Sequence, residues 1–512
     1  MKINKPKNQN FRYNIVSVII YLIGIILIGQ LFNLQIVQGK EFREQSNTRL
    51  TRESVLEAAR GDILDQSGNK LATTSLGYKL ELYKTKLEVK ELNDSLLKIA
   101  QLLERNGDSY IDRLPIKVDP YEFTIGEEAQ VKWKEENKID KSKNAEEVFY
   151  ILKEKYKIDN ENNQEARKIM TLRYHINKVG YSSTKSVEIA SNIGENSLAQ
   201  ISEQSSNFPG INIQSEAVRS YPSGSLASHI LGYIGKISPE QLKGKEDIYD
   251  LNDIIGETGI EYIFEDYLKG KDGIKQIDMA VDGTITDENV AQEAIAGSNV
   301  ILTIDANLQR VAEDTLKNSI QAIANEKKVN VTGGAVVVMK VKTGEVLAMV
   351  SYPDFEPNDF VNGISNDKWT YYTNQEASEY ARNHPFVNRA ISSPSSPGST
   401  YKMATAIAGL ETGKIQLNEK INDTGRYTFY KDYQPYCWNK SGHGYLNVTQ
   451  AIVHSCNYFF YEVGNRVGIY DLNRYTKALG LGKKTGIELL GEEEGYVAGP
   501  ETSKKLGITW NG

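Results

Sequence analysis

The longest apolar stretch of the chain runs from Ile15 to Phe32 and carries no charged side chain. Its polar interruptions are Ser17 and Gln30. At a rise of about 1.5 Å per residue, this stretch continued to Val37 is long enough to cross a hydrocarbon core of roughly 30 Å. The pattern predicts a single N-terminal transmembrane helix over residues 13–37.

Two other interpretations of this stretch are less favoured. A buried helix of a soluble domain normally carries a polar face, which is missing here. A cleaved signal peptide would end in a small-residue cleavage pattern, and none follows the apolar residues. Lys2, Lys5, Lys7 and Arg12 precede the stretch. Residues 1–12 are therefore expected in the cytoplasm, and the bulk of this single-pass protein outside the cell membrane.

After the anchor, strand-like and helix-like patterns alternate. Apolar residues recur at helical spacing on one predicted amphipathic helix. They are Leu92, Leu96, Ile99 and Leu103. Residues 132–168 are rich in Lys, Glu and Asn but keep apolar positions, which is typical of a solvated helical insertion. We therefore expect a mixed α+β domain over residues 38–297, with an inserted helical region at about 84–200.

The pattern changes again near residue 332. Two apolar runs, 335–339 and 346–350, flank Lys342-Thr343-Gly344-Glu345 and predict a buried hairpin with a short turn. In a helix farther on, Met403, Ile407 and Leu410 share a face, and Gly413 is placed as its C-terminal cap. A sheet packed by helices is thus expected over residues 298–512.

Composition excludes several classes of function. The 512 residues are 40% hydrophobic and 25% charged, which is ordinary for a globular protein of at least two domains. A net charge of -7 without a Lys/Arg block argues against nucleic acid as a partner. The two cysteines, Cys437 and Cys456, and five histidines show no short metal-binding spacing. We expect no metal, no cofactor and two free buried thiols, although pairing of the two cysteines stays open.

A candidate catalytic pair lies where a Pro-Gly turn opens an apolar helix. Ser399 follows Pro397-Gly398, and Lys402 comes three residues later. Residues at i and i+3 of a helix share a face, with Cβ atoms about 5–6 Å apart, so the lysine amine can reach the serine hydroxyl. Apolar surroundings would lower the pKa of Lys402 and make it a general base for Ser399 as nucleophile. The helix start also offers N–H groups to an oxyanion.

The Ser-x-x-Lys spacing alone is a weak signal, because it occurs four more times. We favour a structural role for each of these pairs, since none opens an apolar helix after a Pro-Gly turn. They are Ser67/Lys70, Ser95/Lys98, Ser182/Lys185 and Ser365/Lys368.

A second polar pair, Ser455 and Asn457, interrupts apolar residues near the join of two predicted helices. Buried hydroxyl and amide groups need hydrogen-bond partners. In company with Ser399, Ser455 is a candidate proton relay, and Asn457 is a candidate for binding the substrate amide and orienting Lys402. A helix cap is the structural alternative.

Together with further motifs in order along the chain, these two pairs resemble the class B penicillin-binding proteins of the elongation or sporulation type. The further motifs are Arg60-Gly61-Asp62-Ile63-Leu64-Asp65, Arg219-Ser220-Tyr221-Pro222-Ser223-Gly224, His229-Ile230-Leu231-Gly232-Tyr233, Gly256-Glu257-Thr258-Gly259-Ile260-Glu261 and Asn388-Arg389-Ala390. The resemblance implies that residues 38–297 form a rod-like pedestal of the dimerisation type and that residues 298–512 form an α/β transpeptidase domain.

The resemblance also implies a reaction. Ser399 would attack the bond between the two terminal D-alanines of a peptidoglycan stem peptide, release D-alanine, and pass the acyl group to a neighbouring stem amine. β-Lactams resemble the donor and would acylate Ser399. Implied partners are stem peptides, lipid-linked precursor strands, the membrane and a membrane glycan polymerase of the shape, elongation, division or sporulation family. Roles in cell shape and in sporulation both stay open.

The third motif of the family, Lys-Thr/Ser-Gly on a strand, is expected beyond residue 512. Lys342-Thr343-Gly344 precedes Ser399, against the family order, and Lys484-Thr485-Gly486 follows Asn457 too closely. We therefore expect a transpeptidase domain that is incomplete at its C-terminus and of low activity by itself.

Two other functions stay open. One is a non-catalytic scaffold or activator of a glycan polymerase, which the intact Ser399/Lys402 and Ser455/Asn457 pairs disfavour. The other is a β-lactam sensor or hydrolase, which can share the first two motifs. The long pedestal behind a single anchor disfavours it.

Overall fold

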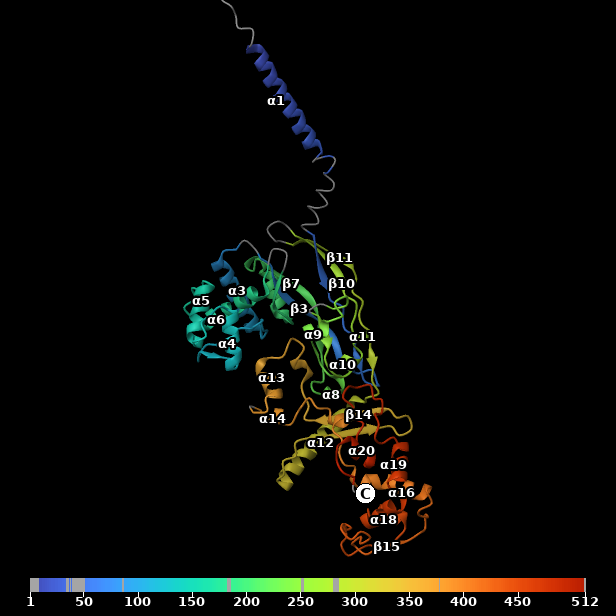
Figure 1. Cartoon of the computed structure of the whole chain (residues 1–512). Coiled ribbons are helices and arrows are strands. Elements are labelled where there is room, and N and C mark those ends of the chain that lie inside the picture. Colours follow the sequence, from blue (N-terminus) through green and yellow to red (C-terminus); the bar gives the residue numbers. More distant parts are fainter. Residues whose placement is uncertain are drawn as a thin grey trace, which may run out of the picture. The chain divides into compact units, whose positions relative to one another are not determined.

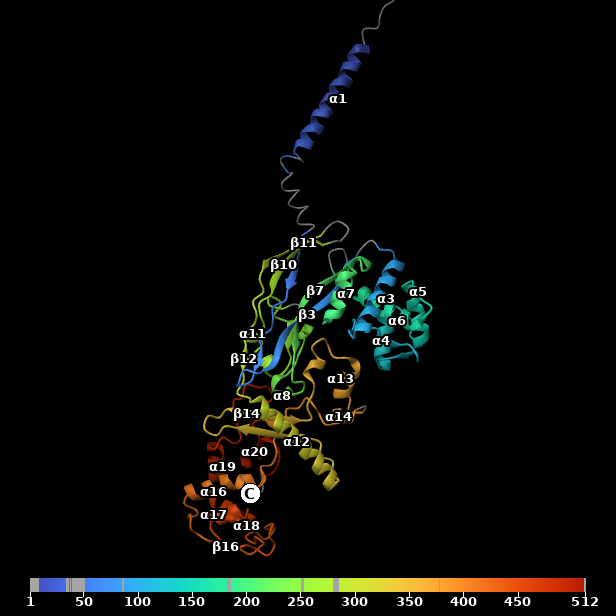
Figure 2. The ribbon, with the colours of Figure 1, turned by 180° about the vertical axis from the view of Figure 1, so that it is seen from behind.

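The computed structural model divides the chain into two compact units that interleave in sequence (Figure 1, and Figure 2 from behind). The first unit comprises residues 1–61, 74–219 and 269–298, and the second comprises 62–73, 220–268 and 299–512. The described residues are 9–33, 36, 38, 51–84, 87–181, 186–249, 253–279, 285–376 and 378–510.

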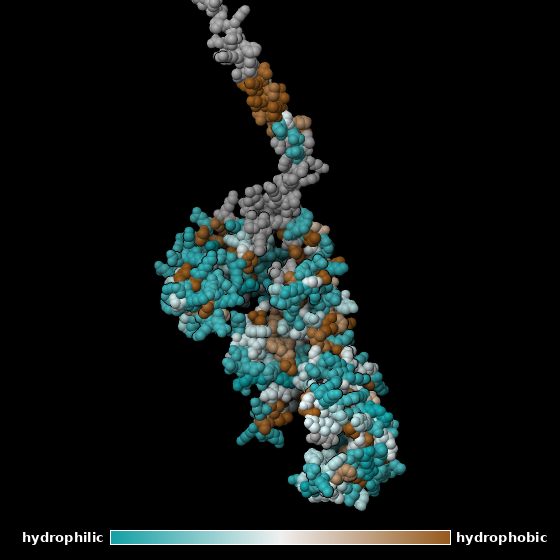
Figure 3. Space-filling model, in the orientation of Figure 1, coloured by the Kyte–Doolittle hydropathy of each residue, from teal (hydrophilic) through white to brown (hydrophobic). Residues whose placement is uncertain are grey.

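The N-terminal helix α1 spans Gln9–Phe32. Figure 3 shows apolar side chains over much of its visible face. Among the described residues, no helix combines the length and the apolarity needed to span a membrane. The membrane helix over residues 13–37 stays a prediction, and Leu34 and Val37 lie outside the described residues.

The first unit is built on two groups of strands. In the first group, β10 (Gly273–Met279) pairs antiparallel with both β1 (Thr51–Leu56) and β11 (Ile285–Gln292). In the second group, β3 (Lys70–Leu82) pairs with β6 (Val187–Ala190) and β7 (Ile211–Ser220). Helices α3 (Val89–Asn106) and α7 (Glu195–Glu203) complete the core beside β3 and β6.

The predicted amphipathic helix is confirmed as α3. Leu92, Leu96, Ile99 and Leu103 are all buried in the core of the first unit. The helix begins with a reciprocal capping box between Glu88 and Glu91 and ends at Gly107, which adopts φ +84°. Both ends therefore satisfy backbone groups that a helix leaves unpaired.

The Lys- and Glu-rich segment forms helices with a core of their own. The elements are β4 (Ile116–Lys117), β5 (Glu122–Phe123), α4 (Glu127–Glu136), α5 (Ala145–Lys155) and α6 (Asn163–Val179). Val148, Phe149 and Leu152 are fully buried, whereas Ile151 faces solvent. The segment is thus helical as predicted, and Val148, Phe149 and Leu152 belong to its core.

The second unit begins with short strands from distant parts of the chain. Strand β2 (Ile63–Leu64) pairs with the start of β3 and, in parallel, with β12 (Val300–Ile301). Tyr221 and Met349 share the core of these strands. The surrounding elements are α8 (Ser228–Leu231), β8 (Ile234–Lys236), α9 (Pro239–Leu242), β9 (Ile254–Gly256), α10 (Gly259–Ile263) and α11 (Glu265–Leu268).

The predicted hairpin is confirmed as β13 (Gly334–Met339) and β14 (Val346–Tyr352), in antiparallel register. Helix α12 (Ala306–Lys327) packs on it. Gln309 of this helix donates a hydrogen bond to the carbonyl of Met349 at 2.9 Å and accepts one from its N–H at 2.8 Å. The buried amide therefore locks α12 to β14 with both of its polar atoms satisfied.

The helices that follow the hairpin make up the rest of the second unit. They are η3 (Pro357–Asp359), α13 (Asn366–Thr373), α14 (Glu379–Arg382), α15 (Arg389–Ser392), η4 (Gly398–Tyr401), α16 (Lys402–Glu411), α17 (Val448–Val453), α18 (Asn457–Val467), α19 (Ile469–Ala478) and α20 (Pro500–Lys505). Strands β15 (Ile421–Asp423) and β16 (Gly444–Leu446) pair between α16 and α17 in the sequence.

Candidate functional site

Ser399 lies in the tight helical turn η4, directly before α16. Gly398 precedes it at φ +59°, a conformation that glycine adopts without strain. Ser399 is exposed, whereas Lys402 is half-buried as the first residue of α16. The neighbouring Tyr401 hydroxyl hydrogen-bonds the Thr476 hydroxyl of α19 at 2.8 Å and fixes the turn to the helices below it.

Helix α16 packs through its small residues, which corrects the face predicted from the sequence. Its buried residues are Ala404, Thr405, Ala406, Ala408 and Gly409. A Cβ on Gly409 would lie 2.7 Å from Val463 of α18, so the two helices approach closely there. By contrast, Met403 and Ile407 are 53% and 39% exposed. Close contact with α18 and α19 (Figure 1) selects the small face. Met403 and Ile407 face away from it, whereas Leu410 is partly buried against the same core.

Ser455 lies in the turn between α17 and α18 with a backbone φ of +49°. This left-handed conformation costs an ordinary residue about 1–2 kcal/mol. Hydrogen bonds from the Ser455 N–H to the Ile452 carbonyl, and from the Cys456 N–H to the Ala451 carbonyl, hold the turn. Asn457 then begins α18. The strained turn directs Ser455 and Asn457 towards Lys402.

The four predicted catalytic residues are joined by hydrogen bonds. The Lys402 ammonium donates to the Ser455 carbonyl at 2.7 Å, to the Ser455 hydroxyl at 3.1 Å and to Asn457 Oδ1 at 2.6 Å. The Ser455 hydroxyl donates to Ser399 Oγ at 3.0 Å. From the sequence we expected Lys402 to reach Ser399 directly. In the structure the Ser455 hydroxyl lies between them in the hydrogen-bonded chain.

Burial makes the neutral form of the Lys402 amine easier to reach. Its three acceptors carry no formal charge, and burial lowers the pKa of Lys402 below its ordinary value. A neutral amine can accept a proton from Ser455, which can in turn accept one from Ser399. The arrangement can therefore carry a proton away from the Ser399 hydroxyl in two short steps.

The effect of the Ser455 turn can be separated from that of its hydroxyl. Ser455→Gly and Ser455→Ala both remove the hydroxyl of the candidate proton relay. If Ser399 reacts with penicillin, as the family resemblance implies, both variants should react at least roughly 100-fold more slowly. Only glycine removes the backbone strain at this position. Ser455→Gly should therefore be about 1 kcal/mol more stable than Ser455→Ala and unfold at a higher temperature. Stopped-flow acylation and thermal melts measure both effects. Full acylation rates in both variants would exclude Ser455 from the relay.

Neither Lys-Thr-Gly string lies on a strand. Lys342-Thr343-Gly344 forms the turn between β13 and β14, where the Gly344 N–H donates to the Lys340 carbonyl at 2.8 Å. In the second string the Thr485 N–H and hydroxyl both donate to Glu492 at 2.6 Å in an exposed loop. The first string thus forms the predicted hairpin turn, and the second makes local contacts in its loop.

The other Ser-x-x-Lys pairs have structural roles wherever they are described. Ser67 lies in a turn organised by Asp65, and Ser365 caps α13 by accepting from the Lys368 N–H. Ser95 is buried in α3 rather than at its surface. Ser182 and Lys185 lie outside the described residues.

A cluster of potential metal ligands lies directly behind the catalytic turn. Asp423, Cys437, His443 and Cys456 present one ligand atom each, all within 4.8 Å of one another. His443 Nδ1 is 2.7 Å from Asp423 Oδ2, and the Cys456 thiol donates to the same oxygen at 3.2 Å. We refer to these four residues as the ligand tetrad. Cys456 lies between Ser455 and Asn457, so the tetrad and the candidate catalytic residues share one segment.

Comparison with known proteins identifies two families along the chain. Residues 55–302 match the penicillin-binding protein dimerisation domain, and residues 334–510 match the penicillin-binding protein transpeptidase domain. The chain belongs to the class B penicillin-binding proteins.

A curated relative agrees with this assignment, and two solved structures share the fold. The chain is 33% identical over 320 residues to the peptidoglycan D,D-transpeptidase MrdA of Acinetobacter baumannii, which covers 62% of this chain and 45% of that relative. It is similar in fold to a complex between penicillin-binding protein PBP2 and MreC from Helicobacter pylori (TM-score 0.62, 24% identity, 90% of this chain and 71% of that chain). A second neighbour is a peptidoglycan synthase complex described as coordinating polymerization and crosslinking. Its TM-score is 0.61 at 22% identity, and the match covers 97% of this chain and 72% of that chain. The chain spans less than half the length of the A. baumannii relative.

The tetrad of this penicillin-binding protein fits a zinc ion. Two thiolates, an imidazole and a carboxylate are a suitable donor set for tetrahedral Zn²⁺, and four protein ligands are typical of a structural rather than a catalytic site. Asp423, Cys437 and Cys456 are buried, and His443 Nε2 is buried with no partner among the described residues. Burial raises the pKa of the Cys456 thiol to about 12 when no metal is present. A bound metal would instead favour the thiolate.

This cluster could not be predicted from the sequence, because its members are spread over residues 423–456. We expected no metal on the ground that no short Cys/His spacing occurs. Cys437 and Cys456 are both free and buried, which agrees with the expected free thiols and not with the alternative of a disulfide. They lie in one cluster without forming a disulfide.

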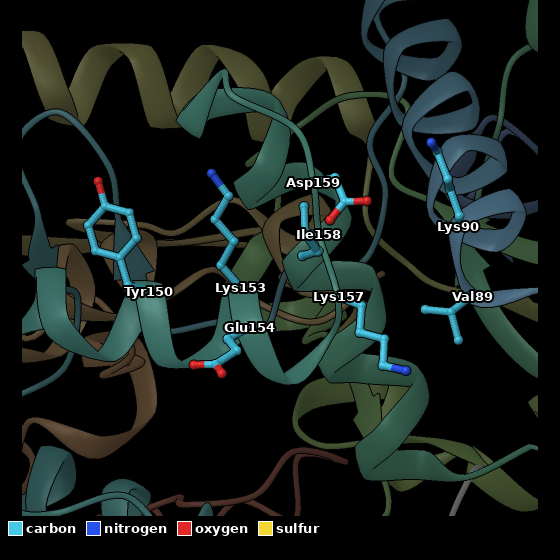
Figure 4. A pocket seen from close by; sticks show the side chains of 8 residues that line it. All are labelled: Val89, Lys90, Tyr150, Lys153, Glu154, Lys157, Ile158 and Asp159. Carbon is cyan, nitrogen blue, oxygen red and sulfur yellow. The ribbon is translucent and has the colours of Figure 1, made fainter.

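One surface hollow lies away from the candidate site. It has a volume of about 570 Å³ and lies in the first unit between the start of α3 and the end of α5 (Figure 4). Lys90, Lys153 and Lys157 line it together with Glu154 and Asp159. None of the four predicted catalytic residues lies in this unit, so the hollow is not part of the candidate site.

Proposed function

We propose that this protein is a peptidoglycan D,D-transpeptidase that cross-links stem peptides through an acyl-enzyme on Ser399. The hydrogen-bonded chain from Ser399 through Ser455 to Lys402 carries the proposal, because it provides a nucleophile together with a route for its proton. The match of residues 334–510 to transpeptidase domains supports the same reaction class.

The proposed reaction has two halves. Ser399 Oγ attacks the carbonyl carbon between the two terminal D-alanines, and its proton moves through Ser455 to the neutral amine of Lys402. The amide C–N bond breaks, the departing nitrogen takes up a proton, and D-alanine leaves. The amine of a second stem peptide then attacks the ester and restores the Ser399 hydroxyl, which forms the cross-link. Asn457, bonded to Lys402, orients the amine and is placed to bind the substrate amide.

The proposed role of Lys402 predicts a specific pH dependence. Only the neutral amine can accept a proton, so the acylation rate should rise with pH through the lowered pKa of Lys402 and level off above it. Lys402→Arg keeps a permanent positive charge with no acceptor. This variant should react slowly at every pH and lose the rise. A rate in the unaltered protein that does not change between pH 5 and about 10 would exclude Lys402 as the base.

Fluorescent penicillin tests the reaction class. The protein expressed from its complete gene should become covalently labelled, and the label should persist because a transpeptidase releases it slowly. Rapid release of hydrolysed drug would identify a β-lactamase-like hydrolase. No labelling at all, with normal binding to a membrane partner, would identify a non-catalytic scaffold.

We also propose that residues 13–37 anchor the protein in the cell membrane, with residues 1–12 in the cytoplasm and the remainder outside. The uncharged run from Ile15 to Phe32 and the basic residues before it support this topology. A reporter fused after Arg60 should be active only outside the cytoplasm. Recovery of the intact chain from the soluble cytosol would contradict both the topology and a cell-wall substrate.

The partner that we propose is a membrane glycan polymerase. One structural neighbour is described as a complex that coordinates polymerization and crosslinking, and the two reactions share a substrate strand. Co-purification from detergent-solubilised membranes tests this proposal. A protein isolated as a monomer under conditions that preserve known membrane complexes would contradict it.

A further inference from the structure

Exposed aromatic side chains are concentrated in the segment that follows β15 and ends within β16. Within residues 427–445, six aromatic side chains are between 49% and 71% exposed. They are Phe429, Tyr430, Tyr433, Tyr436, Trp438 and Tyr445. We refer to residues 427–445 as the aromatic lobe. Leaving so many aromatic side chains exposed to water is unfavourable, which makes this segment a candidate binding surface.

The aromatic lobe is held in one conformation by its backbone. Asp423 pairs with Gly444 where β15 meets β16, and an isolated bridge joins Arg426 to Tyr436. The Cys437 N–H donates to the Gly425 carbonyl at 2.8 Å. A Cβ on Gly425 would lie 2.0 Å from a backbone oxygen, so the two sides of the lobe touch there. The exposed rings therefore project from a fixed frame and need little ordering to bind a ligand.

The lobe is continuous with the candidate catalytic site. The Trp438 indole N–H donates to the carbonyl of His454 at 3.0 Å, one residue before Ser455. The hydroxyls of Tyr427 and Tyr430 donate at 2.8 Å to Glu462 and Asn465 of α18, the helix that Asn457 begins. A chain-like substrate whose reactive end lies at Ser399 could thus extend over the lobe.

The chemistry of the lobe favours a saccharide chain. Five of its six exposed rings belong to tyrosine or tryptophan, which combine an apolar face with a hydrogen-bonding edge. Pyranose rings offer the matching surface, with C–H groups on their faces and hydroxyls at their edges. Arg426 and Lys440 lie 5.2 and 6.0 Å from the ring of Tyr436 and add positive charge beside it. This charge suits the carboxylates that a peptidoglycan strand carries on its stems.

We propose that the aromatic lobe binds the glycan backbone of the peptidoglycan strand whose stem peptide reacts at Ser399. The inference rests on the proposed transpeptidase function and adds a substrate subsite to it. Rings that stack on sugars would hold the strand while the stem peptide enters the site. Penicillin has no glycan, so its reaction with Ser399 does not need the lobe.

Phe429 and Tyr433 provide the test, because their rings make none of the hydrogen bonds described above that tie the lobe to the helices. Phe429→Ala and Tyr433→Ala, combined in one protein, should weaken co-sedimentation with purified insoluble peptidoglycan about 10-fold, since aromatic contacts contribute about 0.5–1.5 kcal/mol each. Tyr470→Ala is the matched control, because Tyr470 is 81% exposed on α19, outside the lobe. It should bind as the unaltered protein does. Penicillin labelling should be equal in all three proteins.

A second measurement follows the tryptophan fluorescence of the unaltered protein. A tetramer of N-acetylglucosamine should change the tryptophan fluorescence of the protein, and Trp438→Phe should remove that change while penicillin labelling persists. Unchanged sedimentation of the Phe429/Tyr433 variant, or a fluorescence change that persists without Trp438, would overturn the proposal. Failure of the unaltered protein to react with penicillin would instead contradict the proposed function. Binding of the glycan strand by the lobe is a separate readout that does not depend on this reaction.

Discussion

Ser399→Ala is expected to abolish covalent labelling by fluorescent penicillin, with a loss of roughly a million-fold in acylation rate. The variant keeps Lys402 and the Ser455 turn but has no oxygen to attack the β-lactam carbonyl. Ser399 is exposed, and its side chain accepts a hydrogen bond from the Ser455 hydroxyl, which the substitution removes. The thermal stability of the protein should therefore change by less than about 1 kcal/mol.

Ser365→Ala is the matched control for this experiment, because Ser365 and Lys368 have the same spacing in the same unit. Its hydroxyl caps α13, so the variant should lose about 1 kcal/mol of stability and no labelling. Mass spectrometry of the labelled peptide identifies the acylated residue. A label that persists in Ser399→Ala and disappears in Ser365→Ala would reverse the assignment.

Removal of a zinc ion from the ligand tetrad is expected to lower the melting temperature of the protein by about 10 °C. A metal held at about 1,000 times its dissociation constant stabilises the folded state by about 4 kcal/mol, and each kcal/mol shifts the melting temperature of a large domain by about 2–4 °C. Elemental analysis should find one zinc ion per chain. A strong chelator should remove the ion and cause the shift.

His443→Ala tests whether the tetrad holds that ion. The variant should contain no zinc, and the chelator should no longer affect its melting temperature. His454→Ala is the control, because its ring lies 5.6 Å from that of His443 but outside the tetrad. Because Cys456 lies beside Ser455, loss of the metal should also slow penicillin acylation. A purified protein without metal, whose melting temperature does not respond to the chelator, would contradict the site.

The parts of the site that depend on local sequence could be predicted. Lys402 comes three residues after Ser399, directly behind a Pro-Gly turn. This local pattern was enough to predict that the two residues lie at the start of a helix. Ser455 and Asn457 were identified by their polarity within apolar helices. The structure brings these four together through the contact of α16 with α18, which the sequence suggests only through the family resemblance.

The parts that depend on long-range packing were not predictable. The buried face of α16 consists of small residues because α18 approaches closely at Gly409, whereas hydrophobicity alone favoured Met403 and Ile407. The position of the Ser455 hydroxyl between Lys402 and Ser399 depends on a left-handed backbone at Ser455. This conformation is uncommon for serine. The ligand tetrad required knowledge of how four segments fold together.

The interleaving of the two units also affects how the protein folds during synthesis. Residues 62–73 emerge from the ribosome early but pack with residues that begin at 299. At about 5–20 residues per second, the intervening stretch of about 230 residues takes roughly 10–50 s to make. During this interval Ile63 and Leu71, which end in a core with Met349, have no native partner from the second half of the chain. A fragment that starts at residue 334 would meet the same problem permanently, because it would expose the surface that these early residues cover.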